Sequence, residues 1–211
     1  MKYNSFYCKV FQIPMKRVLK EKYGKAYADE IMKKSRLLYR RLVEEMDDLG
    51  EGNPMAFNAL FALIFTAPYL ASEKRISPET VQEMMRRGLD FVRFYFAMTD
   101  VNTPRGKRKN ARSVMAYVNW YTPEREARYP TSFKVHFVGK PHEGACYYRS
   151  TGCPICIYMR KLGCEELMPL FCELDHVMIH YQHGVLHRQS TIADGGDYCD
   201  YYITGDKETG V

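Results

Sequence analysis

TSFKVHFV, residues 131–138, is the stretch that decides the fold class of this chain. Its side chains alternate in polarity: Phe133, Val135 and Phe137 are apolar, and Ser132, Lys134 and His136 lie between them. A period of two residues is typical of a strand with one buried face. The stretch therefore predicts a half-buried strand, which separates a helical first part of the chain from a second part that contains strands.

Before this strand, apolar residues recur at helical spacing. Within residues 15–48, Ile31, Leu38 and Met46 fall near one face, as expected of an amphipathic helix that Gly24 can divide in two. A further helix is predicted after residue 77, because Ser77 is a suitable N-cap and Pro78 suits the first helical position.

The stretch PMAFNALFALIFTAPYLAS, residues 54–72, carries no charged residue. Asn58, Thr66 and Pro68 interrupt it, and helical segments flank it. We therefore interpret it as a buried core helix rather than a membrane span, and expect no membrane partner.

After residue 138, short strands and short helices follow one another. ACYYRST (145–151) predicts a second strand. Pro154 and Gly163 have the residue types that begin and end a short helix, and Pro169 and Gly184 delimit a second helix over 169–182. VLHRQSTIA and CDYYIT then flank DGGD, which predicts two strands joined by a glycine-rich turn.

These elements together predict an α+β fold. An N-terminal helical layer packs on a small antiparallel sheet that carries two short cysteine-bearing helices. A chain of 211 residues is expected to form one domain over 1–211, mainly helical over 1–125 and α+β over 126–211.

Bulk composition indicates a soluble protein of the cytoplasm. The net charge of +6 is modest, and the seven cysteines are an odd number without the spacing of a disulfide framework. The first residues lack the apolar region of a secretory signal. The basic cluster PRGKRKNAR (104–112) is interpreted as a solvated loop; because no aromatic residues interleave with it, no nucleic-acid partner is expected. Oligomeric state stays open.

Cys153 is the first candidate for chemistry. At the predicted start of a helix, N–H groups and the helix dipole favour its thiolate, which suits a nucleophile or a metal ligand; a small buried side chain is the alternative. Cys156 completes a C-x-x-C, but too little chain follows for a thioredoxin-like unit, so a redox dithiol is disfavoured.

The motif CELDH provides the second group of candidates. On a helix, Cys172, Asp175 and His176 stand at i, i+3 and i+4 and share one face. A thiol, a carboxylate and an imidazole on one face can serve nucleophilic catalysis, acid–base catalysis or metal binding. His180 continues that face, although an exposed polar edge is the simpler interpretation for it.

A zinc site has to be weighed because five cysteines lie in the second half of the chain, more than the four ligands of a tetrahedral site. They are Cys153, Cys156, Cys164, Cys172 and Cys199. The second half of a standard zinc knuckle is missing near Cys199. The metal therefore stays unknown; if one is present, Cys153, Cys172 and Cys199 are its expected ligands, and zinc is the divalent ion these donors suit.

The stretch TIADGGDYCDYYITGD (191–206) is the last candidate. Gly195 and Gly196 permit a tight turn or a close approach of the backbone to a ligand. Three aspartates surround this turn, and Cys199 falls on a strand face with Tyr201. A plain hairpin explains the glycines but not the cysteine beside so many carboxylates.

With these motifs the chain resembles the L-2-amino-thiazoline-4-carboxylic acid hydrolase family. The resemblance covers about the last sixty residues, and the matching positions are Cys153, Gly163, Glu166, Leu167, Cys172, Asp175, Thr191, Gly195, Gly196, Cys199, Asp200 and Tyr201. The final aromatic residue is usually Phe in the family and is Tyr201 here. Cys156 and Cys164 lie outside the pattern. The same ending is similar to that of vinyl-reductase-type small-ligand-binding domains.

The family resemblance implies a hydrolase that acts on C–N bonds of a small cyclic amidine, opening an L-2-amino-thiazoline-4-carboxylate-like ring to N-carbamoyl-cysteine. It implies catalytic roles for Cys153, Cys172, Asp175, His176 and Cys199, and substrate binding by Arg188, Thr191, Gly195, Gly196 and Asp200. Cys153 or Cys172 is then the nucleophile or a metal ligand, and backbone N–H groups of the two glycines, with Arg188, receive an anion. The alternative is a non-enzymatic domain that senses a small ligand or a metal.

Overall fold

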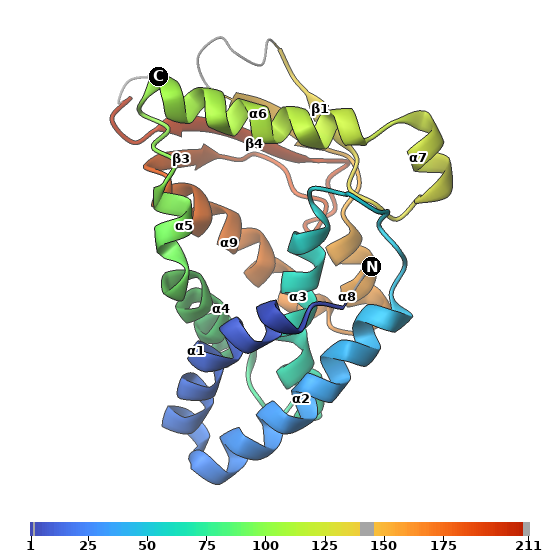
Figure 1. Ribbon diagram of the computed structural model, residues 1–211, viewed down its shortest axis with the longest axis vertical. Coiled ribbons are helices and arrows are strands. Elements are labelled where there is room, and N and C mark those ends of the chain that lie inside the picture. The colour runs from blue at the N-terminus through green and yellow to red at the C-terminus, as the bar shows by residue number, and fades with distance from the viewer. Residues whose placement is uncertain (2, 140–145, 209–211) are drawn as a thin grey trace.

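The computed structural model describes residue 1, residues 3–139 and residues 146–208 (Figure 1). Its helices are α1 (Ser5–Tyr23), α2 (Lys25–Glu45), α3 (Ala56–Ala71), α4 (Pro78–Phe91), α5 (Arg93–Ala97), α6 (Pro104–Trp120), α7 (Pro123–Arg128), α8 (Pro154–Lys161) and α9 (Met168–Tyr181), with a 3-10 turn at Glu165–Leu167. Its strands are β1 (Val135–Phe137), β2 (Cys146–Ser150), β3 (Gly184–His187) and β4 (Cys199–Gly205). The predicted α+β class is confirmed.

The four strands form an antiparallel sheet in the order β1-β2-β4-β3. The register pairs Cys146 with Ile203 and Tyr148 with Tyr201, so these four side chains share one face of the sheet. Cys146, Tyr148 and Ile203 are buried. This face is therefore the one that meets the helices.

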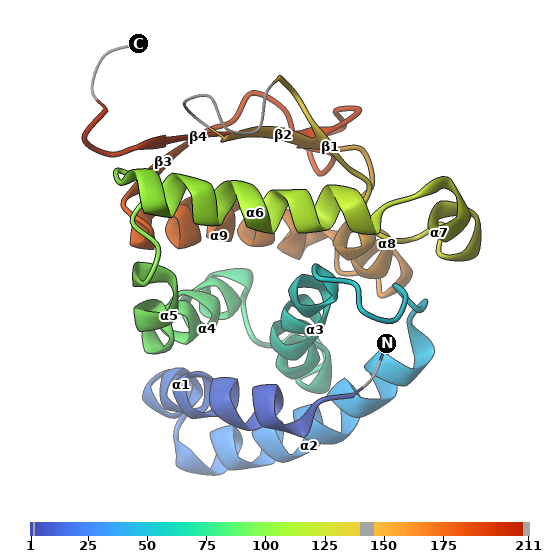
Figure 2. The same ribbon diagram turned by 45° about the horizontal axis from the view of Figure 1, so that its top comes forward.

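Two helices cover the buried face of the sheet. Helix α6 contacts β1 and β2, and α9 contacts β3. Figure 2 shows both helices lying directly against the sheet, with α3 and α4 beneath them and α1 and α2 at the opposite end of the molecule. The N-terminal helices thus reach the sheet through this intermediate layer.

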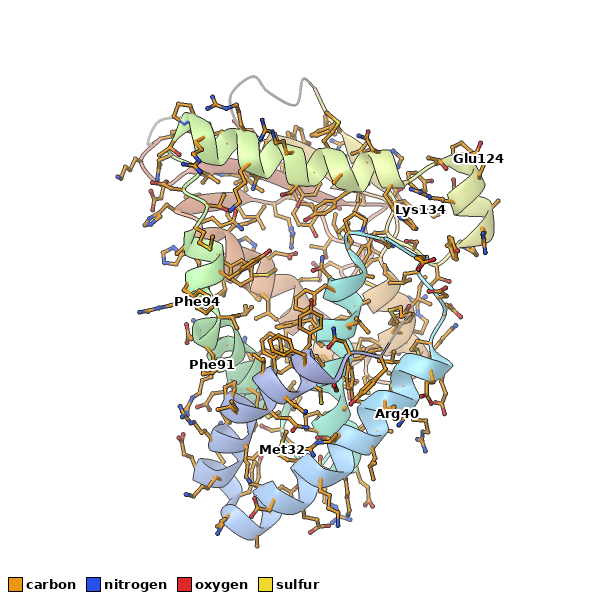
Figure 3. All side chains as sticks on the ribbon, in the orientation of Figure 1. Met32, Arg40, Phe91, Phe94, Glu124 and Lys134 are labelled. Carbon is orange, nitrogen blue, oxygen red and sulfur yellow. The ribbon has the colours of Figure 1, made fainter. Side chains whose placement is uncertain are left out.

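Helix α3 is the apolar centre of the helical part. Its residues from Ala59 to Tyr69 are all buried, which confirms the predicted core helix. The Phe11 ring of α1 meets the rings of Phe61 and Phe65 of α3 edge to face. Figure 3 shows how side chains fill the space between the helices. In the part of the chain that the structure describes, no helix is both long enough and apolar enough to span a membrane.

Several helix boundaries follow the residues that predicted them. Gly24, with φ of 84°, separates α1 from α2. The Ser77 hydroxyl accepts the Thr80 N–H at 3.3 Å, and Pro78 occupies the first position of α4. Cys153 is the N-cap of α8. These positions were predictable because caps and prolines act locally.

The basic stretch 104–112 is not the predicted solvated loop. It forms the first half of α6, because the Thr103 hydroxyl caps the helix by accepting the Gly106 N–H at 3.0 Å and Pro104 fits its first turn. Gly106 lies in this turn because a Cβ there would stand 1.7 Å from the Asp100 carbonyl oxygen. Proline and glycine mark a helix start here rather than a loop.

Two strand predictions differ from the structure, whereas the last predicted helix agrees with it. Within 131–138, only Val135–Phe137 pair as a strand. Helix α9 matches the predicted helix 169–182 to within one residue at each end, and Gly184 begins β3 after His183, which takes the left-handed conformation with φ of 56°. The predicted tight turn between the last two strands is wrong, because β3 stops at His187 and a longer loop, residues 188–198, leads to β4.

Candidate active site

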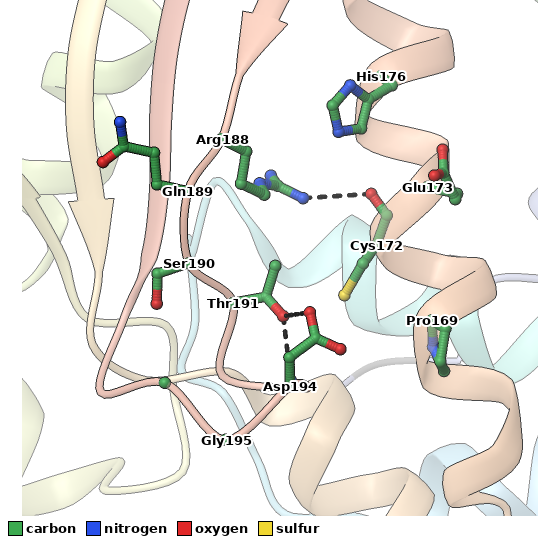
Figure 4. Close-up of a pocket in the computed structure, with 11 residues that line it drawn as sticks. Pro169, Cys172, Glu173, His176, Arg188, Gln189, Ser190, Thr191, Asp194 and Gly195 are labelled. Atoms are coloured by element: carbon green, nitrogen blue, oxygen red, sulfur yellow. Dashed lines mark hydrogen bonds between the residues drawn. The ribbon is translucent and has the colours of Figure 1, made fainter.

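A pocket of about 610 Å³ lies between α9 and the loop 188–198 (Figure 4). Helix α9 contributes one wall and the loop contributes the other. The lining residues are Pro169, Cys172, Glu173, His176, Arg188, Gln189, Ser190, Thr191, Asp194, Gly195 and Gly196. Its size and mixture of polar and apolar groups suit a small polar substrate.

Cys172 and His176 stand one turn apart on α9 and both line this pocket. In Figure 4 the Cys172 sulfur points toward Thr191, and the His176 ring lies on the side of Arg188. The His176 imidazole is exposed and makes no hydrogen bond to any of the described residues. The helix face that Cys172 and His176 share therefore lines a cavity, and no described residue occupies the ring nitrogens of His176.

Asp175 lies behind the pocket wall and binds Arg188. An Arg188 Nη2–H donates to Asp175 Oδ2 at 2.8 Å, and the two side chains are 5% and 25% exposed respectively. The Tyr201 hydroxyl donates to the same carboxylate oxygen at 3.2 Å. Asp175 is thus an anchor for the cation rather than a group facing the cavity.

Arg188 is held by three hydrogen bonds and one ring contact. Besides its bond to Asp175, its Nη1–H donates to the Cys172 carbonyl at 3.2 Å and its Nε–H donates to the Asp200 carbonyl at 3.2 Å. The guanidinium also lies 4.3 Å from the centre of the Tyr201 ring, as in a cation–π contact. Of five N–H donors in a guanidinium, two are left for a ligand in the pocket.

Tyr201 is itself fixed by an aromatic partner. Its ring stacks on that of Tyr148 with centres 4.5 Å apart and an angle of 4°. Burial raises the pKa of Tyr201 well above its ordinary value, with the Asp175 carboxylate adding to the effect. Tyr201 therefore stays a neutral phenol that donates to Asp175.

The Cys172 thiol is protonated at neutral pH. Burial raises its pKa to about 12, and the nearby Asp175 carboxylate adds to the shift. A thiol in this state is a proton donor, and it attacks as a nucleophile only if a base removes its proton.

Four cysteine thiols cluster beside the pocket: Cys153, Cys156, Cys172 and Cys199, which we call the thiol cluster. Each interacts electrostatically with others of the group. They come from the start of α8, from α9 and from the start of β4. Three residues far apart in sequence, Cys153, Cys172 and Cys199, thus lie within electrostatic range of one another, although only Cys172 lines the pocket.

Within the thiol cluster, a hydrogen bond couples the Cys153 and Cys156 thiols. A hydrogen bond between the two thiols lowers the pKa of Cys156. The same bond, together with burial, raises the pKa of Cys153 well above its ordinary value, and the helix N–H groups do not offset it. The catalytic or metal-binding role predicted for Cys153 stays a prediction.

Cys199 is held by the loop that follows β3. The Ile192 N–H donates to Cys199 Sγ at 3.3 Å, and burial raises the pKa of this thiol to about 11. The sulfur therefore ties the start of β4 to residue 192. This contact gives Cys199 a structural role in the core, although several carboxylates lie near it in the sequence.

Asp200 organises the loop 188–198 instead of facing the pocket. It is 5% exposed, and its carboxylate accepts the Gln189 N–H at 3.0 Å and the Ser190 N–H at 2.7 Å. A carboxylate that accepts backbone N–H groups fixes the path of the chain after β3. The predicted substrate contact of Asp200 is replaced by this structural one.

The glycine turn of the loop lines the pocket but has no free donors. The Gly195 N–H donates to the Ile192 carbonyl at 3.2 Å and the Gly196 N–H to the Thr191 carbonyl at 2.9 Å. The Thr191 hydroxyl donates to Asp194 Oδ2 at 2.6 Å. The backbone N–H groups of the two glycines are therefore not free to receive an anion, contrary to expectation.

Across residues 1, 3–139 and 146–208, no three His, Cys, Asp or Glu side chains converge in a way that could hold a metal ion. The arrangement of the thiol cluster thus lends no support to the three-cysteine ligand set. Zinc stays a prediction that has to be tested on the purified protein.

Six of the candidate residues from the sequence line the pocket: Cys172, His176, Arg188, Thr191, Gly195 and Gly196. Their catalytic and substrate-binding roles stay predictions. The sequence did not assign the remaining lining residues to the site: Pro169, Glu173, Gln189, Ser190 and Asp194. Glu173 lies inside the motif CELDH and Asp194 inside TIADGGDYCDYYITGD, so these motifs could have identified both residues. No sequence pattern near Gln189 or Ser190 indicates that they belong to the site.

Comparison with known proteins agrees with the motif analysis. A family model described as L-2-amino-thiazoline-4-carboxylic acid hydrolase matches residues 57–203. The match includes α9, the loop 188–198 and every residue that lines the pocket. Searches of curated proteins and of solved structures gave no match.

Proposed function

We propose, because this chain belongs to the L-2-amino-thiazoline-4-carboxylic acid hydrolase family, that its pocket hydrolyses a small cyclic amidine bearing a carboxylate. The expected reaction opens an L-2-amino-thiazoline-4-carboxylate-like ring to N-carbamoyl-cysteine. One observation carries the proposal: Cys172, His176 and Arg188 line the same pocket. They supply a proton donor, a base and a cation, which this chemistry requires.

The bonds that change follow from the product. The oxygen of water bonds to the amidine carbon, and the bond from that carbon to the ring sulfur breaks. Both nitrogens stay attached to the carbon, which becomes the carbamoyl group, and the sulfur leaves as a thiol. The reaction that gives N-carbamoyl-cysteine is therefore hydrolysis at an amidine carbon with C–S cleavage; C–N cleavage would give a different product, S-carbamoyl-cysteine.

His176 is the proposed general base. Its imidazole is exposed to the pocket; it takes a proton from the attacking water and passes it to the amidine nitrogen as the carbon–oxygen bond forms. As the carbon–sulfur bond breaks, Cys172, kept protonated by its raised pKa, donates its proton to the leaving sulfur. His176 transfers the hydroxyl proton of the addition intermediate to Cys172, so both residues end in their starting state.

Arg188 binds the substrate carboxylate through its two unused N–H groups. Asp175, Tyr201 and the Cys172 carbonyl hold the guanidinium in place. An ion pair with Arg188 fixes one end of the ring, while Cys172 and His176 meet the other. Asp175 is accordingly a positioning residue.

Turnover of L-2-amino-thiazoline-4-carboxylate by the purified protein tests this proposal. N-carbamoyl-cysteine is measured by mass spectrometry, and the released thiol by a colorimetric assay. His176→Gln and Cys172→Ala are each expected to lower kcat by about 100-fold, the usual contribution of a positioned acid or base.

His180→Gln is the matched control for His176. It changes an imidazole one turn further along α9 that is also exposed but does not line the pocket, so kcat is expected to stay within about twofold. Equal losses in both variants would contradict the role of His176. If Cys172 in single-turnover samples carries an adduct with the mass of the substrate, the nucleophile is the Cys172 thiol and not water.

Binding without turnover is the outcome that supports a sensor domain. Calorimetry with the same thiazoline, together with the metal content of the purified protein, separates the two functions. Stoichiometric zinc released by thiol modification, with no hydrolysis, would overturn the enzyme proposal.

A further inference from the structure

A second pocket, of about 640 Å³, lies between α6 and the buried face of the sheet. Its lining comes from α6, from the residues just before α6, and from the paired positions of β2 and β4. The lining residues are Val101, Asn102, Pro104, Lys107, Arg108, Asn110, Ala111, Arg112, Met115, Cys146 and Ile203. None of them lines the first pocket, so the two cavities are separate places in the fold.

The floor of this second pocket is apolar. Val101, Ala111 and Ile203 are buried, at 3%, 3% and 5% exposure, and Ile203 pairs across the sheet with Cys146. Burial raises the pKa of the Cys146 thiol to about 11, which keeps the thiol neutral. Such a floor favours the aliphatic or aromatic part of a ligand.

The rim of the pocket is cationic. Lys107, Arg108 and Arg112 line it, and no aspartate or glutamate appears among the described lining residues. Lys107 pairs with Glu208, whereas Arg108 and Arg112 form no ion pair with any residue that the structure describes. Two guanidinium groups above an apolar cavity attract an anion and can bind a carboxylate through paired N–H donors.

Asn110 adds a hydrogen-bond acceptor that the protein leaves unused. Its Nδ2–H donates to Gln182 Oε1 at 3.4 Å, but its Oδ1 is buried without a partner in the described structure. A buried acceptor without a donor is costly. A ligand that carries an N–H or O–H on its body would satisfy it.

From this cavity we propose that the protein has a second binding site, for a carboxylate with an aromatic or aliphatic body and one hydrogen-bond donor. The carboxylate meets Arg108 and Arg112, the body rests on Val101, Met115 and Ile203, and the donor reaches Asn110. The basic stretch 104–112, which the first pocket does not use, thereby gains a role.

Indole-3-butyrate is a suitable probe because it combines a carboxylate, an aromatic body and an N–H group. Isothermal titration calorimetry of the full chain is expected to show saturable binding. Tryptamine, which has the same ring with a cationic tail, and acetate, which has no body, are expected to bind at least about tenfold more weakly.

Two independent variants test the location of the site. The double variant Arg108→Gln/Arg112→Gln is expected to raise the Kd for indole-3-butyrate by at least about tenfold. Met115→Gln replaces an apolar wall residue on the same helix and is expected to raise it by about threefold. Thermal unfolding checks that each variant keeps the fold.

Arg17→Gln/Arg41→Gln is the charge-matched control. It also removes two positive charges, but from exposed positions on α1 and α2, which lie at the end of the molecule opposite the sheet (Figure 2). Its Kd is expected to stay within about twofold of the wild type. Equal Kd values for the pocket variants and this control, or equal binding of tryptamine, would overturn the proposal.

Discussion

At the residue scale, the ion pair between Asp175 and Arg188 is the contact on which the first pocket depends. Asp175→Asn leaves a cation that is 5% exposed without its counter-ion. The free energy of unfolding is expected to fall by about 3 kcal/mol, because a charge left unpaired in the interior is strongly unfavourable. Urea denaturation measures the change.

Glu173→Gln is the control for Asp175→Asn. It neutralises the exposed carboxylate two positions earlier on α9, and the free energy of unfolding is expected to change by less than about 0.5 kcal/mol. A similar loss in the two variants would show that Asp175 contributes no more than an ordinary surface charge.

Thiol reactivity at Cys172 provides a second prediction at this scale. Because the pKa of Cys172 is raised to about 12, its thiolate fraction increases about tenfold per pH unit throughout the range below that value. Its alkylation rate with iodoacetamide is therefore expected to rise without a plateau from about pH 7 to about pH 10. Peptide mass mapping follows each cysteine separately.

Cys156 is the internal comparison in that experiment. Its lowered pKa predicts faster alkylation at neutral pH and an earlier plateau than at Cys172. A plateau of the Cys172 rate below about pH 9 would mean that its thiolate is stabilised, and Cys172 would then be the better candidate for the nucleophile.

The pairing of Asp175 with Arg188 shows what sequence could not predict. Asp175 was recognised from its spacing to Cys172 and His176, because helical spacing is a local property. Its partner lies in the loop after β3, and the two meet only once α9 packs on the sheet. A carboxylate expected to have a catalytic role is therefore paired with a cation through a tertiary contact.

At the scale of elements, Gly106 allows α6 to start against the segment before it. A Cβ at this position would stand 1.7 Å from the Asp100 carbonyl oxygen, which is backbone and cannot move aside cheaply. Gly106→Ala is expected to lower the free energy of unfolding by about 2–3 kcal/mol through this overlap. Chemical denaturation measures it.

Ser113→Ala, an exposed change on the same helix, is the control for Gly106→Ala and is expected to have an effect below about 0.5 kcal/mol. If Gly106→Ala were neutral or stabilising, as alanine is in an unobstructed helix, the close approach of α6 to Asp100 would be contradicted.

Elements whose ends depend on local chemistry were predicted, and those fixed by distant contacts were not. Ser77 and Pro78 set the start of α4, as did Pro154 for α8. The path after β3 instead depends on the Asp200 carboxylate, which accepts the N–H groups of Gln189 and Ser190. From the sequence, the two glycines indicated a tight turn. The role of Asp200 could not be predicted, because nothing near it in the sequence indicates that its carboxylate accepts these N–H groups.

At the scale of the whole molecule, the buried residues of the helical part and of the sheet belong to one hydrophobic cluster. Phe65 lies in it with no exposed surface, between Phe11 and Phe61. Phe65→Ala is expected to lower the free energy of unfolding by about 3–5 kcal/mol because it leaves a cavity.

Two probes show whether that loss is shared by the entire chain. The single tryptophan, Trp120 at the end of α6, reports on the region next to the sheet, and far-ultraviolet circular dichroism reports on all helices. In Phe65→Ala, both transitions are expected to move to lower denaturant together. Separate midpoints would show two independently folding units and contradict the predicted single domain.

The way Arg188 is held has a consequence for the energetics of any reaction in the first pocket. Its orientation is fixed by Asp175, Tyr201 and two main-chain carbonyls before a ligand arrives. The electrostatic field in the cavity is thus preorganised, and little reorganisation energy has to be supplied as charge develops on a bound molecule. For the proposed hydrolysis, a cation that is already fixed in place lowers the barrier to reaction, and the cost of burying that cation falls on the stability of the folded state.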